Sequence, residues 1–364
     1  MRVLLRADFD VPIANGRVIS DFRIRKALPT IEFLRDRGAK TVILSHLGRS
    51  GETLRPVFEE LAHRLGSGAV RWSAASPGSE LLAATADMRD GDILMLENIR
   101  RRKEEAEGNE EFAREIAKAG DLFVNNAFAD SHRTHASISV VPKFITAYAG
   151  LQMEEEVEAL ERARMPESPA LAILGGAKFE TKEPLIEKFL STYDRVLLGG
   201  ALMNDFLKAK GYEVGVSRIS GRLPSTDILE HPRLTLPVDI IVEKDGLGRA
   251  TTEDGARKDE SIVDIGPKTV AEWSKAIQSS RFVLWNGPLG IYEKGFIAST
   301  EKLARTLASS GARAVIGGND TVAIVQKTNF DPERVFLSTG GGAMLEFLVK
   351  GTLPGIEPLR IPSQ

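Results

Sequence analysis

The sequence predicts an α/β protein with two doubly wound parallel-sheet domains, joined by a helix and a hinge. Short β-rich apolar runs alternate with segments in which apolar residues recur at helical spacing, as in βαβ units. The alternation occurs on both sides of a charged segment at residues 153–165. The length of 364 residues also exceeds the roughly 250–300 residues at which single cores stop growing.

Four apolar runs in the first half are expected to be strands, and each ends in charged or polar residues. They lie at Arg2–Asp10, Thr41–Arg49, Gly91–Arg100 and Asp121–Arg133. Apolar residues at helical spacing predict helices at residues 30–37, 56–65 and 110–119. In an open parallel sheet, ligands bind outside the carboxyl ends of the strands, so this half is expected to offer a cationic pocket.

The strands expected in the second half end in glycine instead. They lie at Leu171–Lys178, Arg195–Leu202, Phe282–Gly290, Ala314–Thr321 and Val335–Ala343. Helices are predicted at residues 182–190 and 300–309, and the Gly- and Asp-rich residues 205–264 are expected to form hairpins or loops. This half therefore offers bare backbone, which suits phosphate.

The charged segment in the middle sets the domain boundaries. Met153, Val157 and Leu160 lie at helical spacing, and Pro166 stops the pattern. We interpret residues 151–165 as a helix between two Rossmann-like domains, at residues 1–150 with 350–364 and at residues 166–349. A surface helix within one large domain is the alternative. The Pro-rich segment Leu353–Gln364 is expected to be extended.

Composition narrows the function classes. Hydrophobic residues make up 42% and charged residues 27% of the chain, as in ordinary globular proteins. A net charge of −3 gives no polycationic character of the kind that nucleic-acid binding uses. The absence of cysteine excludes disulfides, thiolate nucleophiles and Cys-ligated metals. The first strand is expected from Arg2, and no apolar run has the ~18–20 residues of a membrane span. We therefore expect a cytoplasmic protein without a signal peptide.

Two glycine turns of the second half are candidate phosphate sites. Gly340–Gly342 follow a predicted strand and precede a predicted helix, so backbone N–H groups and the helix dipole could both favour an anion. A tight turn is the alternative, although one glycine would suffice for it. Gly175 and Gly176 precede Lys178, and Lys182 follows four residues later, so both lysines could point at one phosphate chain.

Two acids in the second half are candidates for nucleotide binding. Asp320 follows the glycines of a strand end, and Mg²⁺ usually takes one or two carboxylates plus phosphate oxygens and waters. Asp320 is our metal candidate, and an N-cap of the next helix is the alternative. Glu293 could bind a ribose hydroxyl. Neither GxxxxGK[ST] nor GxGxxG occurs, which argues against a P-loop site and against an NAD-dependent dehydrogenase.

Cationic side chains gather at or beside the strand ends of the first half, namely Arg23, Arg49, Arg100 and Arg133, with His46. Arginine forks match phosphate and carboxylate bidentately, and four of them at one sheet edge would repel each other unless they shared an anion. Asp8 and Asp10 could accept hydrogen bonds from substrate hydroxyls, or pair with the arginines in the empty site. His132 and His135 could be metal ligands, but a third ligand is missing.

These residues lie in sequence blocks that resemble the phosphoglycerate kinase family. The blocks are RADFDVP (Arg6–Pro12), SHLGRS (Ser45–Ser50), MLENIRR (Met95–Arg101), VNNAFADSHRTHAS (Val124–Ser137), GGAKFETK (Gly175–Lys182), WNGPLGIYE (Trp285–Glu293), GGNDT (Gly317–Thr321), STGGGAMLEFL (Ser338–Leu348) and LPGIEPL (Leu353–Leu359). They occur in order across essentially the whole chain, which is far more than a single motif provides.

The resemblance implies reversible phosphoryl transfer from 1,3-bisphosphoglycerate to MgADP, giving 3-phosphoglycerate and MgATP in glycolysis, with domain closure. We expect a monomer. The phosphoglycerate would bind the first domain through Asp8, Asp10, Arg23, His46, Arg49, Arg100 and Arg133. MgADP or MgATP would bind the second through Gly176, Lys178, Lys182, Gly200, Asn286, Pro288, Glu293, Gly318, Asp320, Thr321 and Gly340, with Asp320 on Mg²⁺.

In the reverse direction of that reaction the acceptor is the carboxylate of 3-phosphoglycerate, which is already ionised and needs no general base. Catalysis then rests on positioning and charge stabilisation. We assign Arg23 and Lys178 to the equatorial oxygens of the moving phosphoryl group, with backbone N–H groups of Gly341 and Gly342 as further donors. A catalytically weak phosphoanion- and nucleotide-binding protein of the same fold is the alternative.

The chain departs from the family pattern at several positions. Asp10 replaces Asn, Ser50 replaces Pro, Asn126 replaces Asp, Asn319 replaces Gly, and the block GGGMAxTF reads GGALMNDF at Gly199–Phe206. An acid at position 10 would repel an anionic substrate unless an arginine neutralised it.

Overall fold

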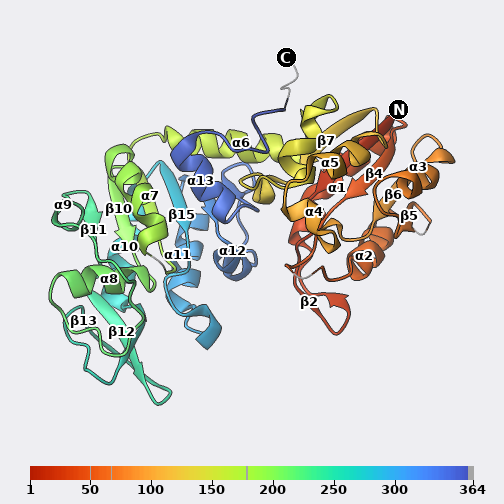
Figure 1. Ribbon diagram of the computed structural model, residues 1–364. Coiled ribbons are helices and arrows are strands. Elements are labelled where there is room, and N and C mark those ends of the chain that lie inside the picture. Colours follow the sequence, from red (N-terminus) through yellow and green to blue (C-terminus); the bar gives the residue numbers. More distant parts are fainter. Residues whose placement is uncertain (50, 67, 178, 360–364) are drawn as a thin grey trace. The chain divides into compact units, whose positions relative to one another are not determined.

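The computed structural model describes residues 1–49, 51–66, 68–177 and 179–359 (Figure 1). The chain divides into two compact units, Met1–Glu158 with Thr352–Gln364, and Ala159–Gly351. The boundary between them falls inside the helix α6 (Leu151–Arg164). Each unit is built around its own parallel sheet.

The sheet of the first unit has the strand order β5-β6-β4-β1-β7-β8, and all its neighbours are parallel. The strands are β1 (Arg2–Ala7), β4 (Lys40–Leu44), β5 (Val70–Ser73), β6 (Ile93–Leu96), β7 (Leu122–Asn126) and β8 (Ala147–Ala149). A short hairpin, β2 (Ile13–Ala14) with β3 (Arg17–Val18), follows β1.

Helices cover both faces of this sheet, because alternate residues of β1 belong to different cores. Val3 and Leu5 pack in one core with Ile24 of α1, whereas Leu4 packs in the other with Ile116 of α5. The helices of the unit are α1 (Phe22–Asp36), α2 (Arg55–Leu65), α3 (Ser79–Ala86), α4 (Lys103–Ala106) and α5 (Glu110–Ala117).

The sheet of the second unit has the order β11-β10-β9-β15-β16-β17 and is also parallel throughout. Its strands are β9 (Ala170–Leu174), β10 (Arg195–Leu198), β11 (Leu234–Thr235), β15 (Phe282–Asn286), β16 (Arg313–Gly317) and β17 (Val335–Leu337). Its helices are α7 (Phe179–Thr192), α8 (Leu202–Ala209), α9 (Thr226–Leu229), α10 (Pro267–Ser279), α11 (Ala298–Ser309), α12 (Asn319–Val325) and α13 (Gly342–Lys350). The predicted fold class of two doubly wound parallel sheets is confirmed.

A small antiparallel sheet decorates the second unit in the region where hairpins were expected. Its strand order is β13-β12-β14, with β12 (Asp239–Lys244), β13 (Leu247–Thr252) and β14 (Ser261–Ile265). Ile240 and Val242 of β12 and Ile262 of β14 join the main core of the unit, so this sheet is packed rather than loose.

One predicted helix is longer than expected, and one local prediction was wrong. The helix predicted at residues 30–37 begins earlier, at Phe22, and contains Pro29, because the buried Ile24 and Ile31 hold it against the sheet across the proline. The segment from Leu353 was expected to be extended, but its described part forms consecutive turns. Gly355 fixes them, since its N–H donates to Ser131 O (2.8 Å) and its carbonyl accepts from Asn125 Nδ2 (2.9 Å). Among the residues described, no helix has the length and apolar character of a membrane span.

Candidate active site

Four adjacent strand ends of the first sheet carry most of the predicted acceptor residues. The strands β6, β4, β1 and β7 are neighbours in that order, and their carboxyl ends share one edge of the sheet. The loops after them carry Arg100 after β6, His46 and Arg49 after β4, Asp8 and Asp10 after β1, and Arg133 after β7. Arg23 is the second residue of α1 and contacts Asp8 at this edge.

Asp8 and Arg23 form a close ion pair. Arg23 Nη1 lies 2.5 Å from Oδ2 of the buried Asp8 carboxylate, whose Oδ1 accepts from the backbone N–H of Asp10 (3.2 Å). Burial lowers the pKa of Arg23, but the charge of Asp8 outweighs it and raises the pKa above its ordinary value. The Asp10 carboxylate accepts from the backbone N–H of Gly48 (2.9 Å), which fixes the loop after β4 to the end of β1.

Asp130 is the centre of the cationic cluster at this edge. Its Oδ2 lies 3.0 Å from Arg6 Nη2 and 2.9 Å from His46 Nδ1, and its Oδ1 lies 2.9 Å from Arg100 Nη2 and 3.5 Å from Arg133 Nε. Burial alone would raise the pKa of Asp130, but the neighbouring His46, Arg6 and Arg100 hold the pKa well below its usual range. The carboxylate is therefore ionised at neutral pH.

Sequence reasoning missed Arg6 and Asp130. Arg6 is fully buried within β1, where its Nε donates to Ser137 Oγ (2.8 Å), and Ser137 Oγ donates in turn to Glu105 Oε1 (2.6 Å). The signal was available, because an arginine inside an otherwise apolar strand must have a buried partner. Asp130 lies three residues before Arg133 at a strand end, where a carboxylate among cations is a natural counter-ion.

Arg49 and the two histidines complete this edge. Arg49 is exposed on the loop after β4. Burial, with Arg100 nearby, lowers the pKa of His135 to about 4, so its ring is neutral at pH 7. The described residues contain no group of three His, Cys, Asp or Glu side chains that could hold a metal, and His132 with His135 form none.

Asn126, where the family pattern has an acid, ties three elements together at the end of β7. Its Oδ1 accepts from Thr30 Oγ1 (3.0 Å) of α1 and from the backbone N–H of Gln152 (3.1 Å) in the first turn of α6. The N–H of Leu151 donates to Thr30 Oγ1 (3.1 Å). Free N–H groups at the start of α6 are thus satisfied by neutral acceptors, so the amide at position 126 has a structural role.

The second sheet has its topological switch point between β9 and β15. The chain runs from β9 to β10 and β11 on one side, and later to β15 on the other, and ligands of open α/β sheets bind at such a point. The two strand ends touch through Gly175 N–H to Asn286 O (2.8 Å) and Gly176 N–H to Pro288 O (2.9 Å). A Cβ on Gly175 would collide with Pro288 O, so only glycine allows this approach.

Gly200, at the end of β10, packs on the same turn. It has φ +61°, and a Cβ there would lie 2.5 Å from Gly176 N. Lys182 of α7 lies against the turn from the protein side, where its buried ammonium donates to Gly175 O. Burial lowers the pKa of Lys182 to about 8. Lys178 lies outside the described residues.

Asp320 is the second residue of α12. The N-cap position belongs to Gly318, with φ +94°, so the alternative in which Asp320 caps this helix is wrong. Partial burial and the nearby Glu293 carboxylate raise the pKa of Asp320. A cation beside these two acids would relieve their repulsion. One carboxylate from the protein together with phosphate oxygens of a ligand is a set of donors that suits Mg²⁺.

Two other predicted nucleotide residues hold the strand ends together. Thr321 is buried, and its Oγ1 accepts from the backbone N–H of Gly287 (3.0 Å), which joins the ends of β15 and β16. Asn286 is also buried, and its Nδ2 lies 3.9 Å from the sulfur of Met344 in α13. Both side chains therefore contact neighbouring segments at the ends of these strands.

The triple glycine lies at the start of α13, with Gly341 at the N-cap position. Gly341 has φ −88°, and a Cβ there would meet no atom within 4 Å. Neither backbone conformation nor packing demands glycine at this position, which argues against the alternative of a tight turn. Open backbone at the N-terminus of a nine-residue helix suits close approach by an anion.

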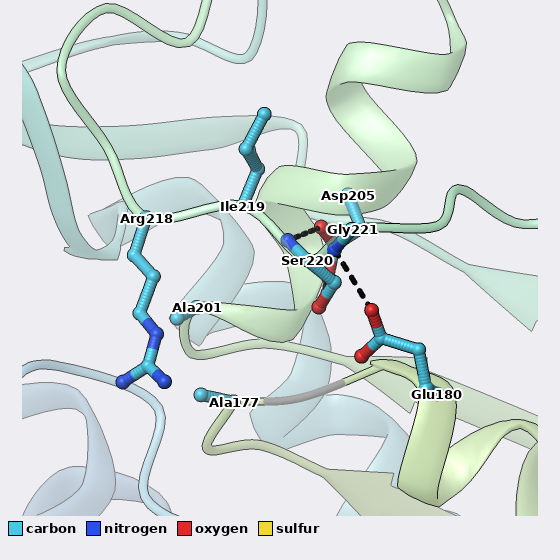
Figure 2. Close-up of a pocket in the computed structure, with 8 residues that line it drawn as sticks. All are labelled: Ala177, Glu180, Ala201, Asp205, Arg218, Ile219, Ser220 and Gly221. Atoms are coloured by element: carbon cyan, nitrogen blue, oxygen red, sulfur yellow. Dashed lines mark hydrogen bonds between the residues drawn. The ribbon is translucent and has the colours of Figure 1, made fainter.

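A cavity of about 300 Å³ adjoins the glycine turns of β9 and β10. It is lined by Ala177, Glu180, Ala201, Asp205, Arg218, Ile219, Ser220 and Gly221. Ala177 and Ala201 directly follow Gly176 and Gly200, and Figure 2 shows the Arg218 side chain extending toward Ala177. The buried Asp205 accepts from Ser220 N–H (2.7 Å) and Ser220 Oγ (3.0 Å), which fixes the loop that closes the cavity.

Comparison with known proteins decides the family. A family model described as phosphoglycerate kinase matches residues 1–351. The chain belongs to the phosphoglycerate kinase family. It is 40% identical to phosphoglycerate kinase from Pelotomaculum thermopropionicum, over 98% of this chain and 96% of that protein. It is 39% identical to that from Dictyoglomus turgidum, over 99% and 95%.

Solved phosphoglycerate kinases also share the fold. The structure from Coxiella burnetii has a TM-score of 0.81 and 36% identity, and that from Pyrococcus horikoshii has 0.86 and 29%; each comparison covers 98% of this chain and 95% of the other. The resemblance inferred from the sequence blocks is confirmed. Membership of a kinase family favours an enzyme over both the binding-protein and the dehydrogenase alternatives.

Proposed function

We propose that this protein catalyses reversible phosphoryl transfer from 1,3-bisphosphoglycerate to MgADP, giving 3-phosphoglycerate and MgATP. The family membership over residues 1–351 carries the proposal. The two sheet edges support it, because one offers a cluster of arginines for an anionic acceptor and the other offers glycine turns for a nucleotide. The first unit is the proposed phosphoglycerate domain and the second the nucleotide domain.

On the acceptor side, the proposed anchors of the non-transferring phosphate are Arg49, Arg100 and Arg133. The shared position of Arg100 and Arg133 supports this role, because both guanidinium groups contact the same oxygen of Asp130. Arg23 is the proposed contact to the moving phosphoryl group, and Asp8 holds its guanidinium in place. His46, Asp8 and Asp10 remain the proposed partners of the carboxylate and hydroxyl groups.

On the nucleotide side, backbone supplies most of the proposed contacts. The N–H groups of Gly340, Gly341 and Gly342 at α13 face the transferring phosphate in the proposal, as do Lys178 and the turns at Gly176, Gly200, Pro288 and Gly318. Lys182, Asn286 and Thr321 support these turns from within the protein. Glu293 is the proposed ribose partner. Mg²⁺, held by Asp320 together with nucleotide oxygens, would offset charge on the phosphates.

The chemistry needs no proton transfer. The bond from phosphorus to the C1 carboxylate oxygen of the bisphosphoglycerate breaks as a bond to a terminal oxygen of ADP forms, and the leaving group departs as an ionised carboxylate. The protein therefore contributes positioning and positive charge rather than a base. Since each ligand belongs to a different unit, closure of the units and exclusion of water are part of the proposal.

The cavity beside the glycine turns is the proposed site of the base. It lies at the ends of β9 and β10, whereas the triple glycine lies at the end of β17, about three strand spacings (~14 Å) beyond β9. Base, ribose and phosphates can then follow the sheet edge from β10 to β17. Ala177 and Ala201 contribute small apolar side chains to its lining, and Arg218 and Glu180 contribute polar groups (Figure 2).

A coupled assay tests the proposal. ATP formation from 1,3-bisphosphoglycerate and MgADP is expected, with GDP compared against ADP at equal concentration, and no turnover is expected without Mg²⁺. Calorimetric binding of 3-phosphoglycerate and MgADP without turnover of either nucleotide would overturn the kinase in favour of the binding-protein alternative. A cytoplasmic location and a monomeric state are parts of the proposal, and sedimentation of the purified chain checks the latter.

A further inference from the structure

Asp130 places a carboxylate among the cations that the proposed function uses for the phosphoglycerate. His46, Arg100 and Arg133 all contact it, at 2.9, 2.9 and 3.5 Å. The Asp130 side chain is only 7% exposed, so it cannot turn away into solvent. An anionic substrate at this edge therefore shares its donors with an acid that the protein itself supplies.

This acid has a clear purpose when no substrate is bound. Arg6 is fully buried and the side chain of Arg100 is 10% exposed, and buried cations without a counter-ion are strongly destabilising. Asp130 neutralises both, and its Oδ2 also lies 2.9 Å from Nδ1 of the buried His46 ring. The same charge acts against the binding of a phosphate ester, because two anions in a partly buried site repel each other.

We infer that Asp130 is an internal counter-ion that stabilises the fold and lowers the affinity of the acceptor site for its anionic substrate. The inference rests on the proposed function for the identity of that substrate, 3-phosphoglycerate. The charge argument itself applies to any phosphate ester that uses Arg100 and Arg133.

The geometry lets substrate and Asp130 occupy the site together. Oδ2 of Asp130 is held from inside by Arg6 and His46, whereas Arg133 is 44% exposed and makes the longest contact. A phosphate can thus bind the exposed guanidinium of Arg133 while Asp130 stays in place. The cost is repulsion between the anions rather than loss of the internal ion pairs.

Asp130→Asn in the full chain tests this, because the amide keeps the shape and one acceptor oxygen but removes the charge. We expect KM and the calorimetric Kd for 3-phosphoglycerate to fall about tenfold, the order expected for one charge several ångströms away in a partly solvated site. Their dependence on salt should become steeper, and kcat should change little. A higher or unchanged Kd overturns the inference; a higher one would mean that Asp130 orients the arginines instead.

Asp90→Asn is the matched control, since it removes the same charge from a side chain that is 80% exposed, just before β6 and thus at the opposite sheet edge. We expect it to leave Kd and KM unchanged. An equal fall in the control would attribute the effect to net charge and overturn the inference.

Thermal unfolding provides a second readout. Asp130→Asn should lower Tm without substrate and should enlarge the rise in Tm that 3-phosphoglycerate produces. If Asp130→Asn does not fold, Asp130→Ser should show the same two shifts in Tm. If neither variant folds at any substrate concentration, the inference that Asp130 lowers the affinity for substrate is overturned. If the wild type is inactive but Asp130→Asn binds 3-phosphoglycerate more tightly, the proposed kinase activity is overturned and the counter-ion inference stands. If the wild type is active but Asp130→Asn binds 3-phosphoglycerate with unchanged affinity, only the counter-ion inference is overturned.

Discussion

The two sheet edges offer an anion donors of opposite kinds. At the first edge the positive charge comes from side chains, and the structure pairs it internally, with Asp8 on Arg23 and Asp130 on Arg100. At the second edge most of the proposed donors are backbone N–H groups, which carry no net charge and need no counter-ion. We therefore expect the arginine cluster of the first edge to be sensitive to changes of charge, and the glycine turns of the second edge to be sensitive to changes of volume.

Removal of Arg23 is expected to have the largest effect. Arg23→Ala should lower kcat by ~10²–10³, as for loss of one transition-state charge contact, with a much smaller change in KM. Steady-state assays measure both. Asp8 loses its partner in Arg23→Ala, so Arg23→Lys is a second variant that keeps the positive charge but loses the bidentate guanidinium. We expect Arg23→Lys to fold and to have a reduced kcat.

Arg25→Ala is the control for Arg23, since Arg25 lies on the same helix with a side chain that is 54% exposed. It should retain near-normal kcat. A near-normal kcat in Arg23→Ala would remove Arg23 from the transition state and would leave the first edge as a binding surface only.

Lys182 is a charge buried at the second edge, so it tests whether that edge tolerates charge. Its folded pKa of about 8 lies below the model-peptide value of about 10.4, so the unfolded chain binds more protons between these values. The stability of the wild type should therefore rise through this pH window, relative to Lys182→Met, by up to about 3 kcal/mol. Urea unfolding of both proteins from pH 7 to 10.5 measures the difference between their free energies of unfolding. The contributions of other titrating groups cancel in this difference. Parallel pH profiles would show that the ammonium is not desolvated in the folded protein.

Periodicity and strand ends predicted the sheets, because a buried parallel strand needs a continuous apolar run. Helix ends were harder to predict from the sequence, since the tertiary packing of Ile24 and Ile31 keeps α1 helical across Pro29. The same holds for the turns after Leu353, which depend on partners more than 200 residues away in sequence, such as Asn125.

For the site, residue types at strand ends indicated most candidates, but not their partners. The sequence pattern gave no means to tell that Lys182 faces inward to Gly175 O, or that Thr321 accepts from Gly287 N–H. Asp130 was not predicted, because an acid close to arginines in sequence looks like part of an ordinary surface ion pair until its burial is known.

Glycine substitutions should separate the two uses of glycine at the second edge. Gly175→Ala should destabilise the fold by about 1–3 kcal/mol, because a Cβ would collide with Pro288 O. Gly341→Ala should leave Tm unchanged, since the space around its Cβ is open. It should instead weaken MgADP binding if a phosphate lies there. Thermal unfolding and calorimetry separate the two outcomes, and a fall in Tm for Gly341→Ala alone would favour the tight-turn alternative.

Asp320 provides the smallest and sharpest contrast with the first edge. Asp320→Asn should raise KM for MgADP about tenfold, or 1.4 kcal/mol, and should shift the Mg²⁺ titration at fixed ADP to higher concentration. Asp259→Asn, which changes an exposed acid in the turn before β14, is the control. An unchanged Mg²⁺ titration would remove Asp320 as a metal ligand. Loss of an acid should thus weaken ligand binding at the second edge and tighten it at Asp130. Opposite effects of the same chemical change would show two different roles for the acids. At the first edge the protein's own acid lowers the affinity for the anionic ligand, whereas at the second edge the acid is needed to hold the cation.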